Sequence, residues 1–193
     1  MSTVKKWLLV YVVILAIASV ALLAGSCGEE EEQYQNRAAD GTSETAAAAK
    51  ETVAESKVKG TIYETELFSI LVPDGWVTED LSAEDLAAEG SVGVVITKDK
   101  DVMQLSVLVD IPEAATFSKQ QVELVVKGLN GTALEEVTIL GIKFFKTSYT
   151  LDGKDQTIFY GDRNGDVVTI AMGGKDHQNN VEIKAILDSI KFK

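Results

Sequence analysis

Cysteine and histidine are nearly absent from the 193-residue sequence, which contains one of each. With Cys27 alone, the chain can form neither an internal disulfide nor a multi-cysteine metal cage. With His177 alone, and no nucleophile marked beside it, no Ser–His or Cys–His pair is recognisable. Gly173-Gly174 lacks the spacing and the Lys-Ser/Thr ending of a phosphate-binding loop. The sequence therefore predicts a protein that is not an enzyme and holds no cofactor.

Basic residues are scarce as well: 18 Lys and Arg stand against 30 Asp and Glu, a net charge of −12. Every acidic residue follows Cys27, whereas Lys5 and Lys6 precede it, so loss of residues 1–26 leaves 30 acidic against 16 basic side chains, or −14. Such a chain repels phosphate backbones, and nucleic acid is not an expected partner. It also adsorbs poorly to anionic lipid, so membrane attachment needs an anchor.

The first 27 residues have the organisation of an export signal. Two lysines precede an uncharged apolar run from Trp7 to Ala24, and small residues follow it. Residues 22–27, Leu-Leu-Ala-Gly-Ser-Cys, resemble the lipobox of bacterial lipoproteins. In that family the cysteine receives a diacylglyceryl group, the signal is cut just before it, and the lipid anchors the product. The resemblance implies a signal peptide at residues 1–26 and lipid attachment at Cys27.

Two other interpretations of this segment stay open. The apolar run exceeds the roughly 7–15 residues of a usual signal core and approaches the ~20 of a spanning helix, so it could be an uncleaved anchor. Ala24 stands where the lipobox prefers leucine, and ordinary signal cleavage near Ala24–Ser26 is the other alternative. All three interpretations place the domain outside the cytoplasmic membrane. Only the lipoprotein interpretation explains the position of Cys27.

Residues 27–58 form a predicted flexible, acidic linker. Glu29 to Glu32 stand in a row, and the residues that follow are mostly Gln, Asn, Ala, Thr and Ser without apolar periodicity. Such a segment buries too little surface to offset its ordering entropy, and adjacent glutamates extend the chain by repulsion. We expect a spacer that holds the following domain away from the membrane.

Strand patterns dominate residues 59–193, the predicted domain. Apolar residues fall on every second position of Val102–Ile111, which predicts a strand with one buried face. Asp152-Gly153 and Asn164-Gly165 are tight-turn pairs that join neighbouring strands into hairpins. The other expected strands are Thr61–Thr65, Leu67–Val72, Val92–Thr97, Val137–Leu140, Lys143–Leu151, Gln156–Tyr160 and Asp166–Met172.

Three helices are expected among these strands. Leu81–Glu89 predicts a short one. Ser118 and Gln121 have the spacing of a capping box, so the clearest helix should begin at Ser118 and place an apolar face at i, i+3, i+4 and i+7. Asn179 should cap the last helix, with Glu182 as its capping-box partner.

The whole pattern predicts an α+β fold, with one antiparallel sheet covered by helices. Phe144 and Phe145 are adjacent and point to opposite faces of a regular strand, so both faces of the sheet should be covered. The large aromatic residues are assigned to the core, with a ligand groove as the alternative. They are Trp76, Phe144, Phe145, Tyr149, Phe159 and Tyr160.

Two stretches of the domain resemble PsbP-like domains. Residues 68–76, Phe-Ser-Ile-Leu-Val-Pro-Asp-Gly-Trp, are similar to their opening strand and Pro-x-Gly-Trp turn, and residues 186–192 to their terminal helix and exit. The resemblance covers about residues 60–193 and implies an α-β-α sandwich. Such domains occur beside photosynthetic membranes and as DcrB-like envelope lipoproteins, mainly as binding and assembly modules. The matching positions are structural, so no functional residue is carried over.

The candidate binding residues are four aspartates beside the two hairpin turns. They could bind calcium loosely if both turns lie at one end of the sheet; the hairpin-turn interpretation is preferred over a calcium loop. No metal is predicted, and His177, in a polar loop, is expected to be exposed. The four are Asp152, Asp155, Asp162 and Asp166.

Two hypotheses for function follow. The leading one is a membrane-anchored, extracytoplasmic lipoprotein whose domain is a non-catalytic protein-interaction or assembly module with a partner in the cell envelope. The alternative is a ligand- or metal-binding carrier lipoprotein of the envelope, which would use the acidic turns or an aromatic pocket. A stability increase with one ligand from a panel would favour the carrier.

Overall fold

The structure, a computed structural model, describes residues 58–81, 83–86 and 88–193. The predicted signal at 1–26, the lipid site Cys27 and the linker up to residue 57 lie outside the described residues. The strands are β1 (Gly60–Glu64), β2 (Phe68–Pro73), β3 (Val77–Leu81), β4 (Val92–Lys98), β5 (Asp101–Leu108), β6 (Glu135–Ile139), β7 (Ile142–Leu151), β8 (Lys154–Arg163), β9 (Asp166–Gly173) and β10 (Lys191–Phe192). The helices are α2 (Ala83–Leu86), α3 (Ala114–Leu129), a 3₁₀ helix (His177–Asn179) and α4 (Val181–Ser189).

The strands form two antiparallel sheets. Seven of them lie in the order β3-β4-β5-β9-β8-β7-β6, and the other three in the order β1-β2-β10. The predicted turns are confirmed: Asp152-Gly153 and Asn164-Gly165 all have positive φ, as tight hairpin turns require. The expected single sheet is wrong, because β2 pairs with β1 and β10 rather than joining the larger sheet.

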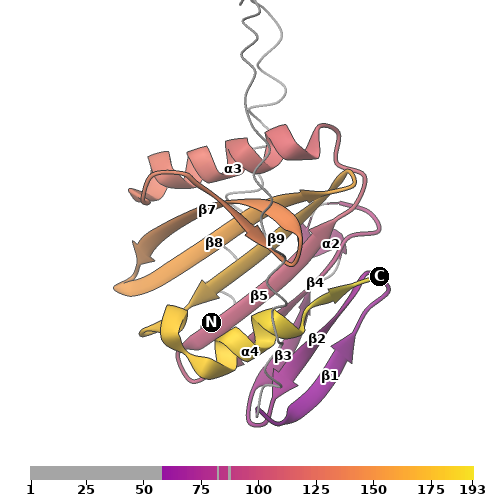
Figure 1. Cartoon of the computed structure of the whole chain (residues 1–193), viewed down its shortest axis with the longest axis vertical. Helices are drawn as coiled ribbons and strands as arrows, with labels where there is room; N and C mark the ends of the chain where they lie inside the picture. Colours follow the sequence, from indigo (N-terminus) through magenta and orange to yellow (C-terminus); the bar gives the residue numbers. More distant parts are fainter. Residues whose placement is uncertain (1–57, 82, 87) are drawn as a thin grey trace, which may run out of the picture.

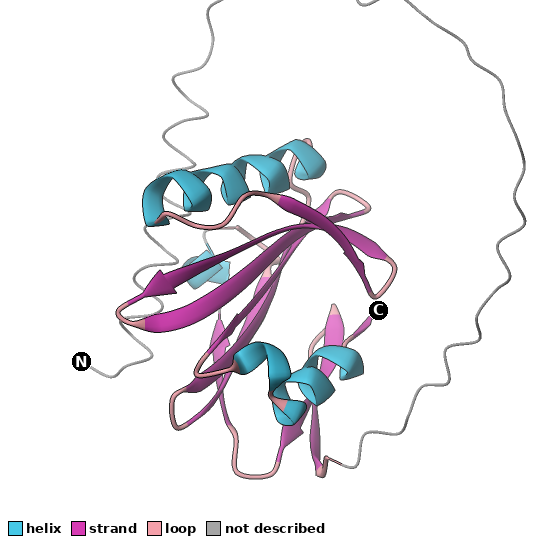
Figure 2. Ribbon diagram, turned by 60° about the vertical axis from the view of Figure 1, so that its left-hand side comes forward, coloured by secondary structure: helices cyan, strands magenta, loops and turns pink. Residues whose placement is uncertain are grey.

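Three layers result (Figures 1 and 2). Helix α3 lies across one face of the seven-stranded sheet, against β7 and β8, and α4 with the small sheet covers the other face. The prediction of an α+β fold with helices on both sides of a sheet is confirmed. Among the described residues, no helix has the length and apolar character needed to cross a membrane.

The seven-stranded sheet separates two hydrophobic cores. One lies under α4 and the small sheet and contains Phe68, Trp76 and Phe144, while the other lies under α3 and contains Tyr149 and Tyr160. The predicted core position is confirmed for five of the six aromatics, whereas Phe145 is half-buried and packs against the edge of the second core. The prediction of a half-buried strand is wrong for β5, in which every residue after the first is buried because the sheet has cover on both faces.

Helix α3 begins four residues before the predicted start. Its N-cap is Glu113, in a left-handed conformation without a side-chain cap. Ser118 lies inside the helix, and its hydroxyl donates to the Ala114 carbonyl at 2.7 Å. Because that bond satisfies the hydroxyl within the helix, Ser118 is tolerated there and does not cap it. The predicted capping box with Gln121 is therefore wrong.

The start of α4 is fixed by Asn180, one residue after the predicted cap. The Asn180 Oδ1 accepts from the backbone N–H groups of Glu182 and Ile183 at 2.9 and 3.2 Å. Glu182 does not act as a capping-box partner. Its carboxylate instead accepts from Lys98 Nζ at 2.8 Å and from Trp76 Nε1 at 3.0 Å. These bonds join α4 to the end of β4 and to the turn before β3.

Lys193, which follows β10, is bound on three sides. The Lys193 backbone N–H donates to the Leu67 carbonyl at 2.9 Å, and its Nζ donates to the Thr65 carbonyl at 2.7 Å. The Arg163 guanidinium donates to the Lys193 backbone oxygen at 2.7 Å and lies 5.1 Å from the centroid of the Phe192 ring. Lys193 is thus attached both to the β1–β2 loop and to the end of β8.

Candidate functional site

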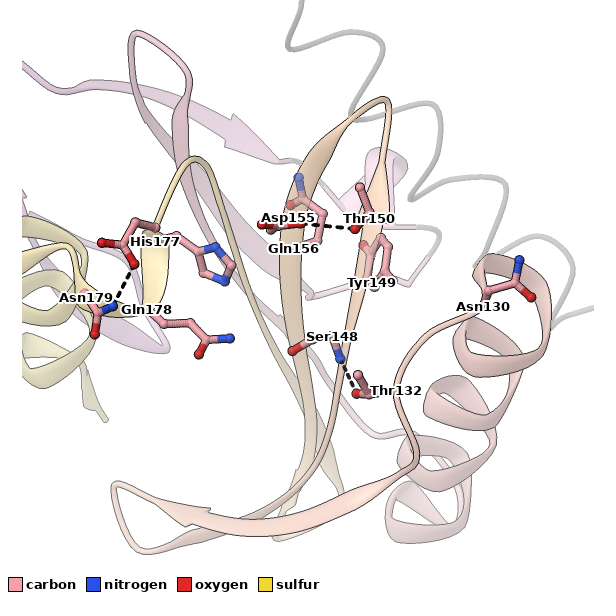
Figure 3. Close-up of a pocket in the computed structure, with 11 residues that line it drawn as sticks. Asn130, Thr132, Ser148, Tyr149, Thr150, Asp155, Gln156, His177, Gln178 and Asn179 are labelled. Carbon is pink, nitrogen blue, oxygen red and sulfur yellow. Dashed lines mark hydrogen bonds between the residues drawn. The ribbon is translucent and has the colours of Figure 1, made fainter.

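A polar pocket lies where the β7–β8 hairpin meets the 3₁₀ helix (Figure 3). Its volume is about 450 Å³. In Figure 3, His177, Gln178 and Asn179 approach from one side, and residues of β7 and β8 from the other. The lining residues are Asn130, Thr132, Ser148, Tyr149, Thr150, Asp155, Gln156, Asp176, His177, Gln178 and Asn179.

His177 is buried, with 3% of its surface exposed, and the prediction of an exposed loop residue is wrong. The chain turns sharply at Gly174 and Asp176, which have positive φ, and this places the ring over the sheet. Its Nε2 lies 2.9 Å from the Thr157 Oγ1, and its Nδ1 lies 3.2 Å from the Gly174 carbonyl oxygen. Burial of the polar ring is compensated by these two hydrogen bonds.

The contacts of His177 determine its tautomer. A carbonyl oxygen can only accept, so the Nδ1 must carry the hydrogen that it shares with Gly174. In a neutral ring the Nε2 is then an acceptor, and the Thr157 hydroxyl donates to it. Thr157 also lies 3.0 Å from the Ser148 Oγ and accepts from the Gln178 Nε2 at 3.2 Å. A continuous hydrogen-bonded chain therefore runs from His177 to the half-buried Ser148.

This arrangement differs from a catalytic nucleophile–base pair. The hydroxyl in contact with His177 belongs to Thr157, which is 1% exposed and cannot reach a substrate. Ser148 is one hydrogen bond further from the ring. The Nδ1 is bound to a backbone carbonyl, which holds the ring in place but supplies no negative charge to stabilise an imidazolium. The chemistry that the geometry favours is hydrogen bonding to a bound group.

The charge in the pocket is negative. Asp155 and Asp176 line it, whereas no Lys or Arg is among its described lining residues. The Asp155 Oδ1 accepts from Thr150 at 3.1 Å, and the Asp176 Oδ1 accepts from Asn179 at 2.6 Å. Burial raises the pKa of Tyr149 to about 12, so this phenol stays neutral at physiological pH. A cation or a neutral hydrogen-bond donor therefore fits the pocket better than an anion.

The four predicted aspartates are divided between the two ends of β8. Asp152 and Asp155 lie at the turn before this ten-residue strand, and Asp162 and Asp166 lie at the turn after it. Ten residues of strand span roughly 30 Å, so the four cannot share an ion. Asp155 alone joins the pocket. Among the described residues, no group of three or more His, Cys, Asp or Glu is placed to hold a metal ion.

A second pocket lies at the opposite end of β8 and has a volume of about 470 Å³. It is bounded by the β6–β7 turn, the first residues of α3 and the β8–β9 turn. Asp162 lines it, together with Lys143 and Arg163. Asp166 lies outside, with its Oδ1 accepting from the backbone N–H of Asp110 at 3.1 Å. This pocket has no buried histidine or hydroxyl chain, and it provides a matched control for the first.

Comparisons with known proteins give likeness of structure only. No protein-family model matches the chain, and no curated protein matches it. The solution structure of cyanobacterial PsbP (CyanoP) from Synechocystis is 14% identical with a TM-score of 0.46, covering 76% of this chain and 98% of that one. A structure from Bacteroides thetaiotaomicron is 12% identical with a TM-score of 0.41, covering 65% and 45%. A protein of unknown function from Pseudomonas aeruginosa is 15% identical with a TM-score of 0.32, covering 60% and 83%. The α+β fold of the chain follows from its own strands and helices.

Proposed function

We propose that this chain is an extracytoplasmic lipoprotein, anchored through Cys27, whose domain binds a small polar molecule without transforming it. The observation that carries the proposal is the pocket beside His177. Its volume of about 450 Å³ is within the range of small-molecule sites, roughly 300–1,000 Å³. The carrier hypothesis is thereby favoured over the assembly hypothesis.

The polar groups of the pocket are held in position before a ligand arrives. Thr132 and Ser148 are joined by two hydrogen bonds: the Thr132 N–H donates to the Ser148 carbonyl at 2.7 Å, and the Ser148 N–H donates to the Thr132 Oγ1 at 3.0 Å. Thr157 holds His177 and Gln178 on the facing side. Preorganised groups lose little entropy on binding, which favours affinity for a specific ligand.

Ligand binding is tested by thermal unfolding of the full-length protein in detergent against a panel of small metabolites and divalent ions. A ligand at 100 times its Kd stabilises the folded state by about 2.7 kcal/mol, which raises Tm by several degrees. The increase should be lost in Asp155→Asn and kept in Asp162→Asn, the same change in the second pocket. No increase with any compound would contradict the proposal.

The lipid anchor is tested separately by fractionation of cells that express Cys27→Ala. Without the thiol no thioether to lipid can form, so the variant should leave the membrane fraction or accumulate with its signal uncut. Ser26→Ala, which keeps the thiol and a small residue before it, is the control and should fractionate like the wild type. Unchanged membrane attachment and mass in Cys27→Ala would favour an uncleaved apolar anchor instead.

The assembly-module hypothesis remains the second candidate because of the free edge of β1. This strand pairs only with β2 among the described strands, and Ile62 on it is 60% exposed. An unpaired edge with an exposed apolar residue can accept a strand from a partner. Crosslinking of the membrane-anchored protein should capture an envelope protein in wild type and in Thr61→Lys to a similar degree, but less in Ile62→Lys. Equal capture by all three would exclude this edge.

A further inference from the structure

The hydrogen-bonded chain from His177 to Ser148 has two complete arrangements. When the ring is neutral, its Nδ1 hydrogen goes to the Gly174 carbonyl, and the Thr157 hydroxyl hydrogen goes to the Nε2. The two lone pairs of Thr157 then accept from the Gln178 Nε2 at 3.2 Å and from the Ser148 hydroxyl at 3.0 Å. Every hydrogen-bonding position of the buried Thr157 hydroxyl is used, and Ser148 has no hydrogen left for the pocket.

Protonation of the ring reverses this chain without moving a heavy atom. The added proton, taken from water, stays on the Nε2, which can then only donate, so the Thr157 oxygen accepts from it. Thr157 still accepts from Gln178, and its own hydrogen turns to the Ser148 oxygen. The Ser148 hydrogen is released and points into the pocket. Because this arrangement is as fully hydrogen-bonded as the neutral one, the same fold accommodates both.

The titratable groups around the ring are mainly carboxylates. Two aspartates line the pocket with it, and no Lys or Arg is among the described lining residues. Carboxylates supply counter-charge to a protonated ring, which the Gly174 carbonyl does not. The titratable groups on the elements packed against the ring are Asp176 and Lys175 of its own loop, Tyr149 of β7, Asp155 of β8, Asp101 of β5, and Glu182 and Lys184 of α4.

We propose that His177 sets the hydrogen-bonding polarity of the pocket according to pH. With the ring neutral, Ser148 presents lone pairs to a ligand and favours a donor group; with the ring protonated, Ser148 presents a hydrogen and favours an acceptor. The ring is 3% exposed, so it acts through Thr157 as a positioning residue. This His177–Thr157–Ser148 relay is a property of the protein alone, while its effect on binding rests on the proposed function, because it regulates the same pocket.

The relay is tested by nitrogen-15 NMR of the imidazole in the full-length protein, labelled on histidine, in detergent and without a histidine tag. His177 is the only histidine, so the two ring signals belong to it alone. At about pH 8 we expect the tautomer with hydrogen on the Nδ1, and acidification should protonate the Nε2 while the protein stays folded. The opposite tautomer, or a ring that stays neutral until the protein unfolds, would overturn the inference.

Ser148→Ala tests whether the ring is coupled to the pocket. In the neutral arrangement the variant removes a donor to Thr157, whose oxygen still accepts from Gln178. In the protonated arrangement it leaves the buried Thr157 hydrogen without an acceptor, so protonation of the ring becomes harder. The midpoint of the ring titration should therefore fall by about one pH unit, which is about tenfold weaker proton binding.

Two variants control for this shift. Ser148→Thr keeps a hydroxyl at the position and should titrate like the wild type. Thr150→Val removes a hydroxyl of the same strand and pocket that donates to Asp155 rather than to Thr157, and it should leave the midpoint unchanged. An unchanged midpoint in Ser148→Ala, or an equal fall in Thr150→Val, would show that Ser148 is not coupled to the ring, and the relay would be wrong.

The relay and the proposed function fail in different experiments. No ligand is present in the titration, so a fall of the midpoint confined to Ser148→Ala supports the relay whatever the metabolite panel shows. If a compound of the panel binds but the midpoint does not fall, only the relay is wrong. If the midpoint falls but no compound binds, the proposed function fails and the relay has no role in binding.

Discussion

The indole Nε1 of Trp76 donates to the Glu182 Oε2 at 3.0 Å, although the residues lie 106 positions apart. The same carboxylate accepts from the Lys98 Nζ through both oxygens, at 3.0 and 2.8 Å. One acidic side chain therefore joins the turn before β3, the end of β4 and the first turn of α4. The Glu182 carboxylate thus accepts hydrogen bonds from a charged side chain, Lys98, and from a buried core side chain, Trp76.

The Glu182 contact should make the stability of the folded protein decrease at acidic pH. The hydrogen bond from Lys98, aided by that from Trp76, lowers the pKa of Glu182 below 4.5. Because the folded value lies below the unfolded one, the stabilisation is present above the unfolded pKa and is lost as pH falls through the folded pKa. Glu182→Gln should lower Tm by a few degrees at neutral pH, and the difference should shrink toward about pH 3. A constant difference would contradict the electrostatic origin.

At alkaline pH, ionisation of Tyr149 should reduce the stability of the folded protein. Burial raises its pKa from 10.0 to about 12, and burial likewise raises the pKa of Tyr160. With the folded pKa above the unfolded one, stability is complete below pH 10 and is lost as pH rises toward 12. Urea unfolding should show Tyr149→Phe gaining on the wild type by up to about 2 to 3 kcal/mol over that interval. Parallel pH profiles would show that this phenol ionises as easily folded as unfolded.

Position 157 can be tested for stability independently of any ligand. Thr157→Val keeps the shape of the side chain but leaves the His177 Nε2 without its donor in a buried site. We expect a loss of about 1–3 kcal/mol in the free energy of unfolding. Thr138→Val, on an exposed position of β6, is the control and should change little. A neutral Thr157→Val would mean that the ring has another partner.

Gln121 predicts a stabilising substitution. It is 1% exposed, and neither its Nε2 nor its Oε1 has a partner in the described part of the chain. Gln121→Met keeps the volume and removes the unpaired amide, so the free energy of unfolding should rise by about 1 kcal/mol. Gln120→Met, one residue earlier and exposed, should have no comparable effect. Destabilisation by Gln121→Met would indicate that an internal water serves the amide.

Eight of the ten strands were predictable from the sequence because their signals are local, whereas β3 and the two-residue β10 were not predicted. Alternation and the Asp152-Gly153 and Asn164-Gly165 pairs determine conformation within a few residues. The predicted helix start at Ser118 was wrong because a serine hydroxyl can also act inside a helix, where it donates to the carbonyl four residues earlier. The cap at Asn180 was displaced by one residue because two asparagines stand side by side and either can cap.

The candidate site depended on distant pairings and was largely invisible in the sequence. His177 lies among polar residues, which locally indicate exposure. Its burial arises because β8 brings Thr157 beneath it, twenty residues earlier in the chain. The four candidate aspartates do not come together for the same reason. The order β9-β8-β7 places the two hairpin turns at opposite ends of β8, the strand they share. The sequence signal that could have located the site is the Asp152-Gly153 turn, which pairs Ser148 with Thr157 across the β7–β8 hairpin. That pair is one of eight in the hairpin, and nothing local distinguishes it.

Attachment of Lys193 to Thr65, Leu67 and Arg163 has a consequence for how the two sheets separate. Strand β10 pairs with β2 in the small sheet, while the residue after it accepts a hydrogen bond from the end of β8 in the large one. Detachment of β10 therefore breaks bonds to both sheets together, and amide hydrogen exchange at Lys193 becomes a direct report of how often the small sheet opens.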